Sequence, residues 1–230
     1  CQNTQQVAEF LASDPRIAHV AYPGLPSDPQ HHRGAAQLMG RKQPMINALA
    51  RLGGITADGK MVFPNATVYV AKDEASHWLN KETAAKAPKE AQPFFQAAQD
   101  AVAPYEAAGK LKQFAAGDAL ADGVASVSLP GHTPGHEGYM FSSKDHQLLV
   151  WGDIVHSHSV QFANPRVSID FDTDQKQAIA TREKLFARAA KEKFWIAGAH
   201  LPFPGIGHAA QQEAGYRWIP AEYSPLPAGN

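Results

Sequence analysis

From about residue 61 onward, short apolar runs with strand-like alternation are separated by segments in which apolar residues recur at helical spacing. The segments predicted as strands are 66–71, 123–129, 139–142, 148–151 and 194–197. The segments predicted as helices are 73–80, 91–108 with a break at Pro104, and a helix that ends near residue 191. Asp172 and Gln175 resemble a capping box at the start of that last helix. Strands that alternate with helices indicate an α/β layered domain.

The first forty residues carry weaker and shorter patterns. A short amphipathic helix is expected over 4–12, a strand over 17–22 and a second short helix over about 30–39. A run rich in proline and glycine follows the strand and predicts a rigid turn.

Three of the predicted strands end in a glycine followed closely by a side chain that can bind a metal. These ends are Gly131-His132, Gly152-Asp153 and Gly198-Ala199-His200. Loops at strand ends are where a rigid scaffold presents functional groups, and glycine lets the backbone turn sharply there. A single histidine at a strand end is more often structural, so the three ends matter only as a set.

Composition narrows the classes of function. The chain has 230 residues, 44% hydrophobic and 19% charged, which fits one α/β domain or one domain with a small appendage. The net charge of −1 gives no basic footprint for nucleic acid, and no apolar run reaches the roughly 18 residues of a membrane helix. One cysteine, Cys1, excludes an intrachain disulfide. Eleven histidines direct attention to metal chemistry.

Three motifs, SLPGHTPGHE, LVWGDI and AGAHLPFPGIGH, together resemble the last three metal-ligand motifs of the metallo-β-lactamase superfamily. The resemblance implies that His132 binds a first metal, that His200 binds a second, and that Asp153 bridges both and is the catalytic residue. It implies that His136 supports the ligands from behind or is structural. Zinc, or another divalent transition metal, is the implied cofactor.

A narrower resemblance, to the methyl parathion hydrolase branch, covers about residues 52–225. It rests on stretches such as VFPNATVYVAKDEASHWLN and VQFANPRVSIDFDTDQKQAIATREKLFARAAK, and on the closing GYRWIPAEYS. In that branch a tryptophan and a phenylalanine wall an aromatic leaving-group pocket. The matching positions are Trp78 and Phe94, and the alternative that both are core aromatics is weighted equally.

The sequence departs from the superfamily pattern at its first metal-ligand motif. The superfamily's motif H-x-H-x-D-H precedes a hydrophobic residue and Gly-Gly, which here are Leu52-Gly53-Gly54. The four ligand positions are occupied by Ile46, Ala48, Ala50 and Arg51, none of which binds a metal at neutral pH. His156 with His158, which would face one side of a strand, and the adjacent His31 and His32 are less favoured substitutes.

Residues 5–40 resemble a different family, the pyridoxal-phosphate transsulfuration enzymes of the cystathionine γ-synthase type, through the run YPGLPSDPQH. That family's Schiff-base lysine is not included, so no pyridoxal phosphate is expected. The predicted organisation is an appended segment over 1–40, a seam over 41–51 and a metallo-β-lactamase-like domain over 52–230. The chain is therefore interpreted as a chimera.

The sequence predicts an α/β fold, a partial metallo-β-lactamase αββα sandwich whose first half is truncated or replaced. The predicted function is a metal-dependent hydrolase of a small ester, lactone or phosphotriester, impaired and with substoichiometric metal because the H-x-H-x-D-H motif is absent. The alternative is an inactive chimeric or degenerate homologue that acts as a binding or structural module. A homodimer is left open, and the resemblance implies a periplasmic or secreted location with a cytoplasmic one as the alternative.

Overall fold

The computed structural model describes residues 55–222. The chain divides into two units, Cys1–Gln43 and Pro44–Asn230, and all described residues belong to the second. The elements predicted over 4–12, 17–22 and 30–39, the proposed boundaries at 40 and 51, and the positions Ile46 to Arg51 lie outside the described residues.

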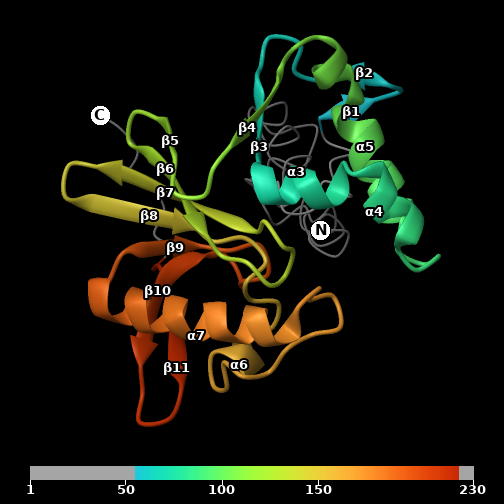
Figure 1. Ribbon diagram of the computed structural model, residues 1–230. Helices are drawn as coiled ribbons and strands as arrows, with labels where there is room; N and C mark the ends of the chain where they lie inside the picture. The colour runs from blue at the N-terminus through green and yellow to red at the C-terminus, as the bar shows by residue number, and fades with distance from the viewer. Residues whose placement is uncertain (1–54, 223–230) are drawn as a thin grey trace, which may run out of the picture. The chain divides into compact units, whose positions relative to one another are not determined.

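A seven-stranded sheet forms the centre of the described region, with the strand order β11-β10-β9-β8-β7-β6-β5 (Figure 1). The strands are β5 (Ala119–Ala121), β6 (Val124–Ser128), β7 (Glu137–Ser143), β8 (His146–Val150), β9 (Trp195–Ala197), β10 (Ile206–Gln211) and β11 (Tyr216–Pro220). The strands predicted over 139–142 and 148–151 form a hairpin, in which β7 and β8 pair in an antiparallel register from Tyr139 opposite Val150 to Ser143 opposite His146.

The directions of three strands decide where the site forms. β8 and β9 are parallel, whereas β7 is antiparallel to both β6 and β8. β6, β8 and β9 therefore run the same way, and their carboxyl ends meet at one edge of the sheet. Each of these three ends leads into one of the glycine-containing motifs noted above.

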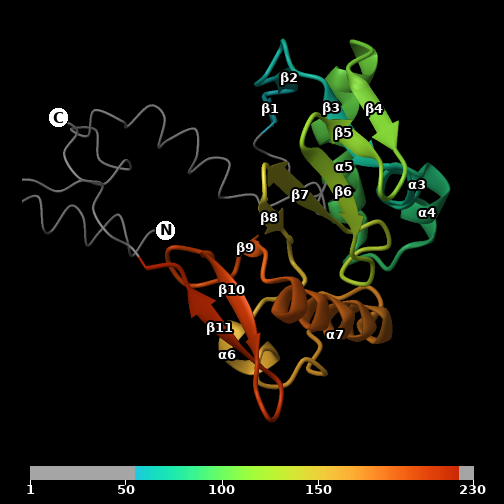
Figure 2. The same ribbon diagram turned by 90° about the vertical axis from the view of Figure 1, so that its left-hand side faces the viewer.

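Helix α7 (Gln175–Glu192) packs against the sheet beside β10 (Figures 1 and 2). Its apolar face buries Leu185, Phe186 and Ala189 in the main core, which also contains Trp151 and Ile196. The prediction of a cap at Asp172 and Gln175 is wrong by two residues: the N-cap is Asp174, whose carboxylate accepts a hydrogen bond from the N–H of Gln177. Asp172 is thereby free for another contact.

A smaller core lies under the parallel pair of β3 (Val68–Ala71) and β4 (Leu111–Phe114). The helices of this part of the chain are α3 (Lys72–Trp78), α4 (Lys81–Lys86) and α5 (Gln92–Ala107). A short antiparallel pair is formed by β1 (Thr56–Ala57) and β2 (Lys60–Met61). The predicted break at Pro104 is wrong, because α5 continues to Ala107. Tyr105 is fully buried and donates a hydrogen bond to the carbonyl of Ile55 at 2.9 Å, which holds the last turn in place.

No helix within residues 55–222 is long and apolar enough to cross a membrane. The α6 helix (His158–Gln161) is a single turn that follows the loop after β8.

Candidate metal centre

The loop from Leu129 to His136 presents the first histidine motif between β6 and β7. It closes on itself through a hydrogen bond from the N–H of Leu129 to the carbonyl of His136 at 2.8 Å. Gly131 has φ 128°, and a Cβ there would lie 2.2 Å from the backbone nitrogen of Ala178 in α7. Only glycine allows this close approach, which brings the loop against the start of α7.

Asp153 lies between the other two predicted ligands. Its Oδ1 is 3.3 Å from Nε2 of His200, and its Oδ2 is 3.6 Å from Nε2 of His132. Asp153 and His132 are buried, and the side chain of His200 is about one-third exposed, at 32%. The three side chains that the sequence placed at three strand ends are thus brought together, with each carboxylate oxygen of Asp153 facing one histidine.

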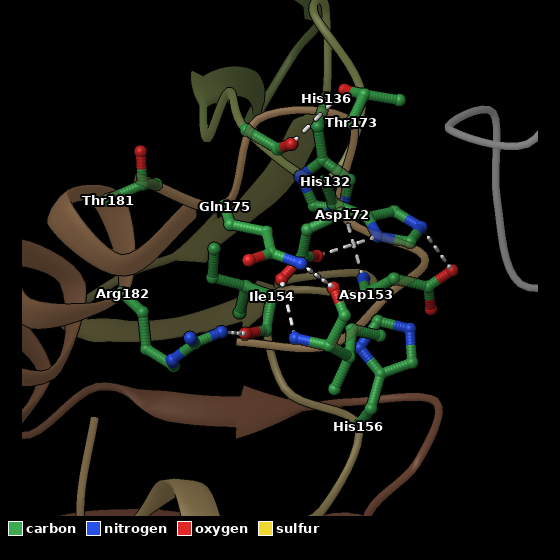
Figure 3. Close-up of polar contacts among 12 residues, drawn as sticks. His132, His136, Asp153, Ile154, His156, Asp172, Thr173, Gln175, Thr181 and Arg182 are labelled. Atoms are coloured by element: carbon green, nitrogen blue, oxygen red, sulfur yellow. Dashed lines mark hydrogen bonds and ion pairs between the residues drawn. The ribbon is translucent and has the colours of Figure 1, made fainter. Parts of the chain in front are cut away.

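His136 lies behind this group rather than in it. It is fully buried, and its Nε2 accepts a hydrogen bond from the backbone N–H of Asp153 at 3.0 Å (Figure 3). Its ring stands edge-on to that of His132, with centroids 5.7 Å apart. The geometry lets His136 hold the backbone that carries the central carboxylate.

Two further side chains join the cluster: His156, which the sequence offered only as a less favoured substitute ligand, and Asp172, which it offered as a helix cap. Asp172 places Oδ1 3.1 Å from Nδ1 of His132 (Figure 3). His156 places its ring 4.9 Å from that of His132 and 4.5 Å from that of His200. His156 lies in a loop and His158 begins α6, so the strand on which the two were expected to share a face is not formed.

The electrostatics favour a charged Asp153 carboxylate beside neutral imidazoles of His136 and His156. Burial alone raises the pKa of Asp153, but the contact with His200 and the charges of His132, His200 and His156 lower it below its ordinary value. Burial lowers the pKa of His156 to about 4, and His132 and His200 add to this effect. Burial likewise lowers the pKa of His136 to about 3. A neutral imidazole is the form that binds a metal.

Two buried side chains on helices fix the loops that carry these groups. Glu74 of α3 accepts a hydrogen bond from the N–H of Gly135 at 2.9 Å, inside the loop between His132 and His136. Arg182 of α7 donates to the carbonyl of Ile154 at 2.8 Å, directly after Asp153 (Figure 3). Neither contact was predicted, because the sequence gives no sign that these helical residues face the loops.

The predicted pocket residues lie on α3 and α5. Trp78 is buried and packs on Phe95 and His77, with ring centroids 4.7 Å away in both cases. Phe94 is 53% exposed, so it is available to a ligand in a way that Phe95 is not. The role of Trp78 and Phe94 in a leaving-group pocket stays a prediction.

A surface pocket of about 410 Å³ lies beside the first histidine loop. It is lined by His77, Pro130, Gly131, Pro134, Thr173, Asp174 and Gln177. None of the clustered ligand candidates lines it, so it adjoins the cluster without containing it.

The donor set fits a transition metal. Within residues 55–222 two groups of side chains bring their ligand atoms within 4.8 Å of one another: Asp153, His156 and His200, and His132, His156 and Asp172. Asp153 Oδ1, His156 Nδ1 and His200 Nε2 are buried and make no hydrogen bond in the described part of the chain. Buried polar atoms are normally satisfied, and imidazole with carboxylate is a donor combination typical of zinc.

A family model and several known proteins each match a short part of the chain. Residues 1–49 match the family model of Cys/Met metabolism PLP-dependent enzymes. Canavanine gamma-lyase of Pseudomonas canavaninivorans is 42% identical over 57 residues, 25% of this chain and 14% of that protein. A protease HtpX homolog of Polaromonas naphthalenivorans (strain CJ2) is 91% identical over 22 residues, 10% of this chain and 8% of that protein. The chain spans only a small part of these relatives.

Solved structures match a much larger part of the chain. The hydrolase AbOPH of the beta lactamase superfamily superposes with a TM-score of 0.71 and 45% identity over 75% of this chain and 61% of its own. AidC, a dizinc quorum-quenching lactonase solved with the product N-hexnoyl-L-homoserine, superposes with a TM-score of 0.68 and 30% identity, again over 75% of this chain and 61% of its own. The predicted fold class, a mixed α/β fold related to β-lactamase-fold hydrolases, is confirmed. The chain spans about three-fifths of either structure.

Proposed function

We propose that this chain binds a divalent transition metal at Asp153 and its surrounding histidines and acts as a metal-dependent hydrolase of the metallo-β-lactamase superfamily. The observation that carries the proposal is the placement of the Asp153 carboxylate between His132 and His200. The similarity to AbOPH and to the lactonase AidC supports the reaction class.

The clustered residues would take two roles, binding the metal and orienting the groups that bind it. Asp153 and His200 would hold the metal together with a neighbouring imidazole, that of His132 or His156, and Asp172 and His136 would orient His132 and Asp153. When bound, such an ion polarises a carbonyl or phosphoryl oxygen and lowers the pKa of water. The hydrogen bond to Asp172 places the proton of His132 on Nδ1 and leaves the lone pair of Nε2 directed at the Asp153 side.

Small neutral esters, lactones and phosphotriesters are the proposed substrates. A substrate with an aromatic leaving group would place it against the exposed ring of Phe94. This finer assignment, and with it the methyl parathion hydrolase branch, rests on the resemblance of the stretches that carry Trp78 and Phe94.

The test is hydrolysis by the purified full chain with added Zn²⁺, Mn²⁺ or Co²⁺. Aryl esters, lactones and aryl phosphotriesters should each be offered, with Asp153→Asn as the matched variant. We expect turnover that a chelator abolishes and that Asp153→Asn lowers by at least about a hundredfold, since an oxygen shared by the ligand cluster loses its charge. Absence of metal-dependent turnover on every substrate contradicts the proposal.

A second function is favoured by the sequence around residue 50. Ile46, Ala48, Ala50 and Arg51 stand where the superfamily has metal ligands, so the chain would be an inactive homologue that serves as a binding or structural module. The combined variant Ile46→His, Ala48→His, Ala50→Asp and Arg51→His separates the two functions. Restored turnover in this variant, with none in its parent, supports the inactive homologue; equal turnover in both supports the hydrolase.

A further inference from the structure

His156 occupies the middle of the histidine cluster. Its ring lies between those of His132 and His200, stacked on the ring of His200 at an interplanar angle of 26°. Its Nδ1 is buried and makes no hydrogen bond within the described residues. A buried ring nitrogen that makes no hydrogen bond within the described residues, in a ring stacked on His200 and close to the Asp153 carboxylate, is suited to bind a cation.

The backbone that carries His156 is held in place from inside the protein. The fully buried Gln161 accepts hydrogen bonds at its Oε1 from the N–H groups of His156 and Ser157, at 2.7 and 3.0 Å. Its Nε2 donates to the carbonyl of Val167 at 3.0 Å. These three bonds use the carbonyl oxygen and one N–H of the side-chain amide, so the backbone that carries His156 is held in place before any ion arrives.

Arg182 holds the same loop from a second side. Besides the carbonyl of Ile154, it donates to the carbonyls of Pro165 and Val167 at 2.9 and 2.6 Å. Arg182 and Gln161 thus meet at the carbonyl of Val167. A loop that is tied by two buried side chains presents His156 as firmly as Asp153.

We propose that His156 is a metal ligand, and that the chain binds a single divalent transition metal ion through Asp153, His156 and His200. The ligand atoms of these three residues lie within 4.8 Å of one another. Two ligands of one tetrahedral zinc ion at ~2.0–2.1 Å stand about 3.3 Å apart. The separation of Asp153 Oδ1 and His200 Nε2 is 3.3 Å.

Three protein ligands and one open position are what a catalytic zinc site requires. His132 faces the other oxygen of the carboxylate, Oδ2 at 3.6 Å, and its second nitrogen is engaged by Asp172. His156 therefore supplies the third ligand that Ile46, Ala48, Ala50 and Arg51 do not. This inference rests on the metal-binding part of the proposed function and not on hydrolysis.

The experiment is a Co²⁺ titration of the metal-free full chain, followed by its visible absorption and by equilibrium dialysis. The variants are His156→Gln, His200→Gln and the control His158→Gln; His158 lies two residues away and belongs to no candidate metal group among residues 55–222. We expect one Co²⁺ per chain in the wild type. His156→Gln and His200→Gln should each weaken binding by more than tenfold and change the spectrum, whereas His158→Gln should leave both unchanged.

His156→Asp is the second variant, since it keeps a ligand at this position and should bind Co²⁺ more tightly than His156→Gln. Unchanged affinity and spectrum in His156→Gln, or two equally tight ions per chain in the wild type, overturn the inference. If Co²⁺ binding depends on His200 but not on His156, this inference fails while the proposed function stands. If binding depends on His156 but no substrate is hydrolysed, the inference stands and the proposed hydrolase fails.

Discussion

The Oδ1 atom of Asp172 lies 3.1 Å from Nδ1 of His132, across 40 positions of sequence, and both side chains are buried. The contact fixes the His132 tautomer and turns its Nε2 towards Asp153. Burial alone raises the pKa of Asp172, but its contacts with His132, the N–H of Ile169 and the charge of Arg182 lower it, so the carboxylate is charged at neutral pH. A carboxylate–histidine pair of this kind orients the groups that surround a metal site.

Asp172→Asn is therefore expected to weaken metal binding by about 10- to 100-fold, because His132, which faces the second oxygen of the Asp153 carboxylate, loses its charged partner. Asp174→Asn is the matched control, since Asn caps a helix as well as Asp and the side chain accepts its hydrogen bond from Gln177 of α7. Both affinities can be measured by competition with a chromophoric chelator. Equal affinity in the two variants would show that Asp172 does not support the site.

Glu74 makes the stability of the fold depend on pH. Burial raises its pKa to about 7, only partly offset by hydrogen bonds from Thr133, Gly135 and Trp78, and burial also raises the pKa of Glu137 to about 7. The folded state therefore binds more protons than the unfolded state between about pH 4.5 and pH 7, so stability decreases as pH rises through this window. The Glu74 contribution is at most ~3 kcal/mol.

Glu74→Gln should reduce the loss of unfolding free energy between pH 5 and pH 8, measured by urea denaturation at both values. Glu82→Gln, at an exposed position of α4, is the control and should retain the full loss. The part due to Glu137 remains in both variants. A pH dependence in Glu74→Gln that matches the wild type would contradict the assignment.

Arg182 stabilises the fold mainly through hydrogen bonds to backbone carbonyls. It is fully buried and donates to three backbone carbonyls of the segment between β8 and α7. Lysine cannot reproduce this planar arrangement of donors, and a buried carbonyl left without a donor costs about 1–3 kcal/mol. Arg182→Lys should lower the free energy of unfolding by about 2–4 kcal/mol.

Arg188→Lys is the comparison for Arg182→Lys, since Arg188 lies on the same helix in a partly exposed pair with Glu192. Arg188→Lys should change the free energy of unfolding by no more than about 0.5 kcal/mol. Urea or thermal unfolding gives both values. Equal effects of the two substitutions would mean that the three carbonyl contacts contribute nothing.

Phe94→Ala tests the leaving-group pocket better than Trp78→Ala. Trp78 packs on Phe95 and donates a hydrogen bond to Glu74, so its removal also disturbs the smaller core and the loop at Gly135. Phe94→Ala should weaken the binding of 4-nitrophenol, an aromatic leaving group, by about fivefold, close to 1 kcal/mol of lost apolar contact. Phe171→Ala, at a position 73% exposed, should leave binding unchanged. If Phe94→Ala binds 4-nitrophenol as tightly as the unsubstituted chain does, the leaving-group pocket does not include Phe94.

Much of the fold could be predicted from local patterns, because each pattern reflects which side of an element faces the core. The strands β6, β7, β8 and β9 and the helix α7 lie where the alternation of apolar and polar residues predicts them. The break expected at Pro104 was wrong because the packing of Tyr105 outweighs the cost of one missing hydrogen bond in the last turn of α5. Adjacent Phe94 and Phe95 cannot both face inwards on a helix, and the sequence did not show which one does.

The sequence by itself determined that His132, Asp153 and His200 could meet, since each follows a strand that ends at a glycine turn. Only the tertiary structure decided that they do, because their meeting requires β6, β8 and β9 to point the same way in one sheet. It also brought in His156 and Asp172. The sequence offers His156 only through its spacing to His158 on a strand that does not form, and Asp172 as a helix cap, whereas Asp174 is the cap in the structure. Contacts between residues far apart in the chain depend on how whole elements pack, and that information is not contained in the spacing of any single motif.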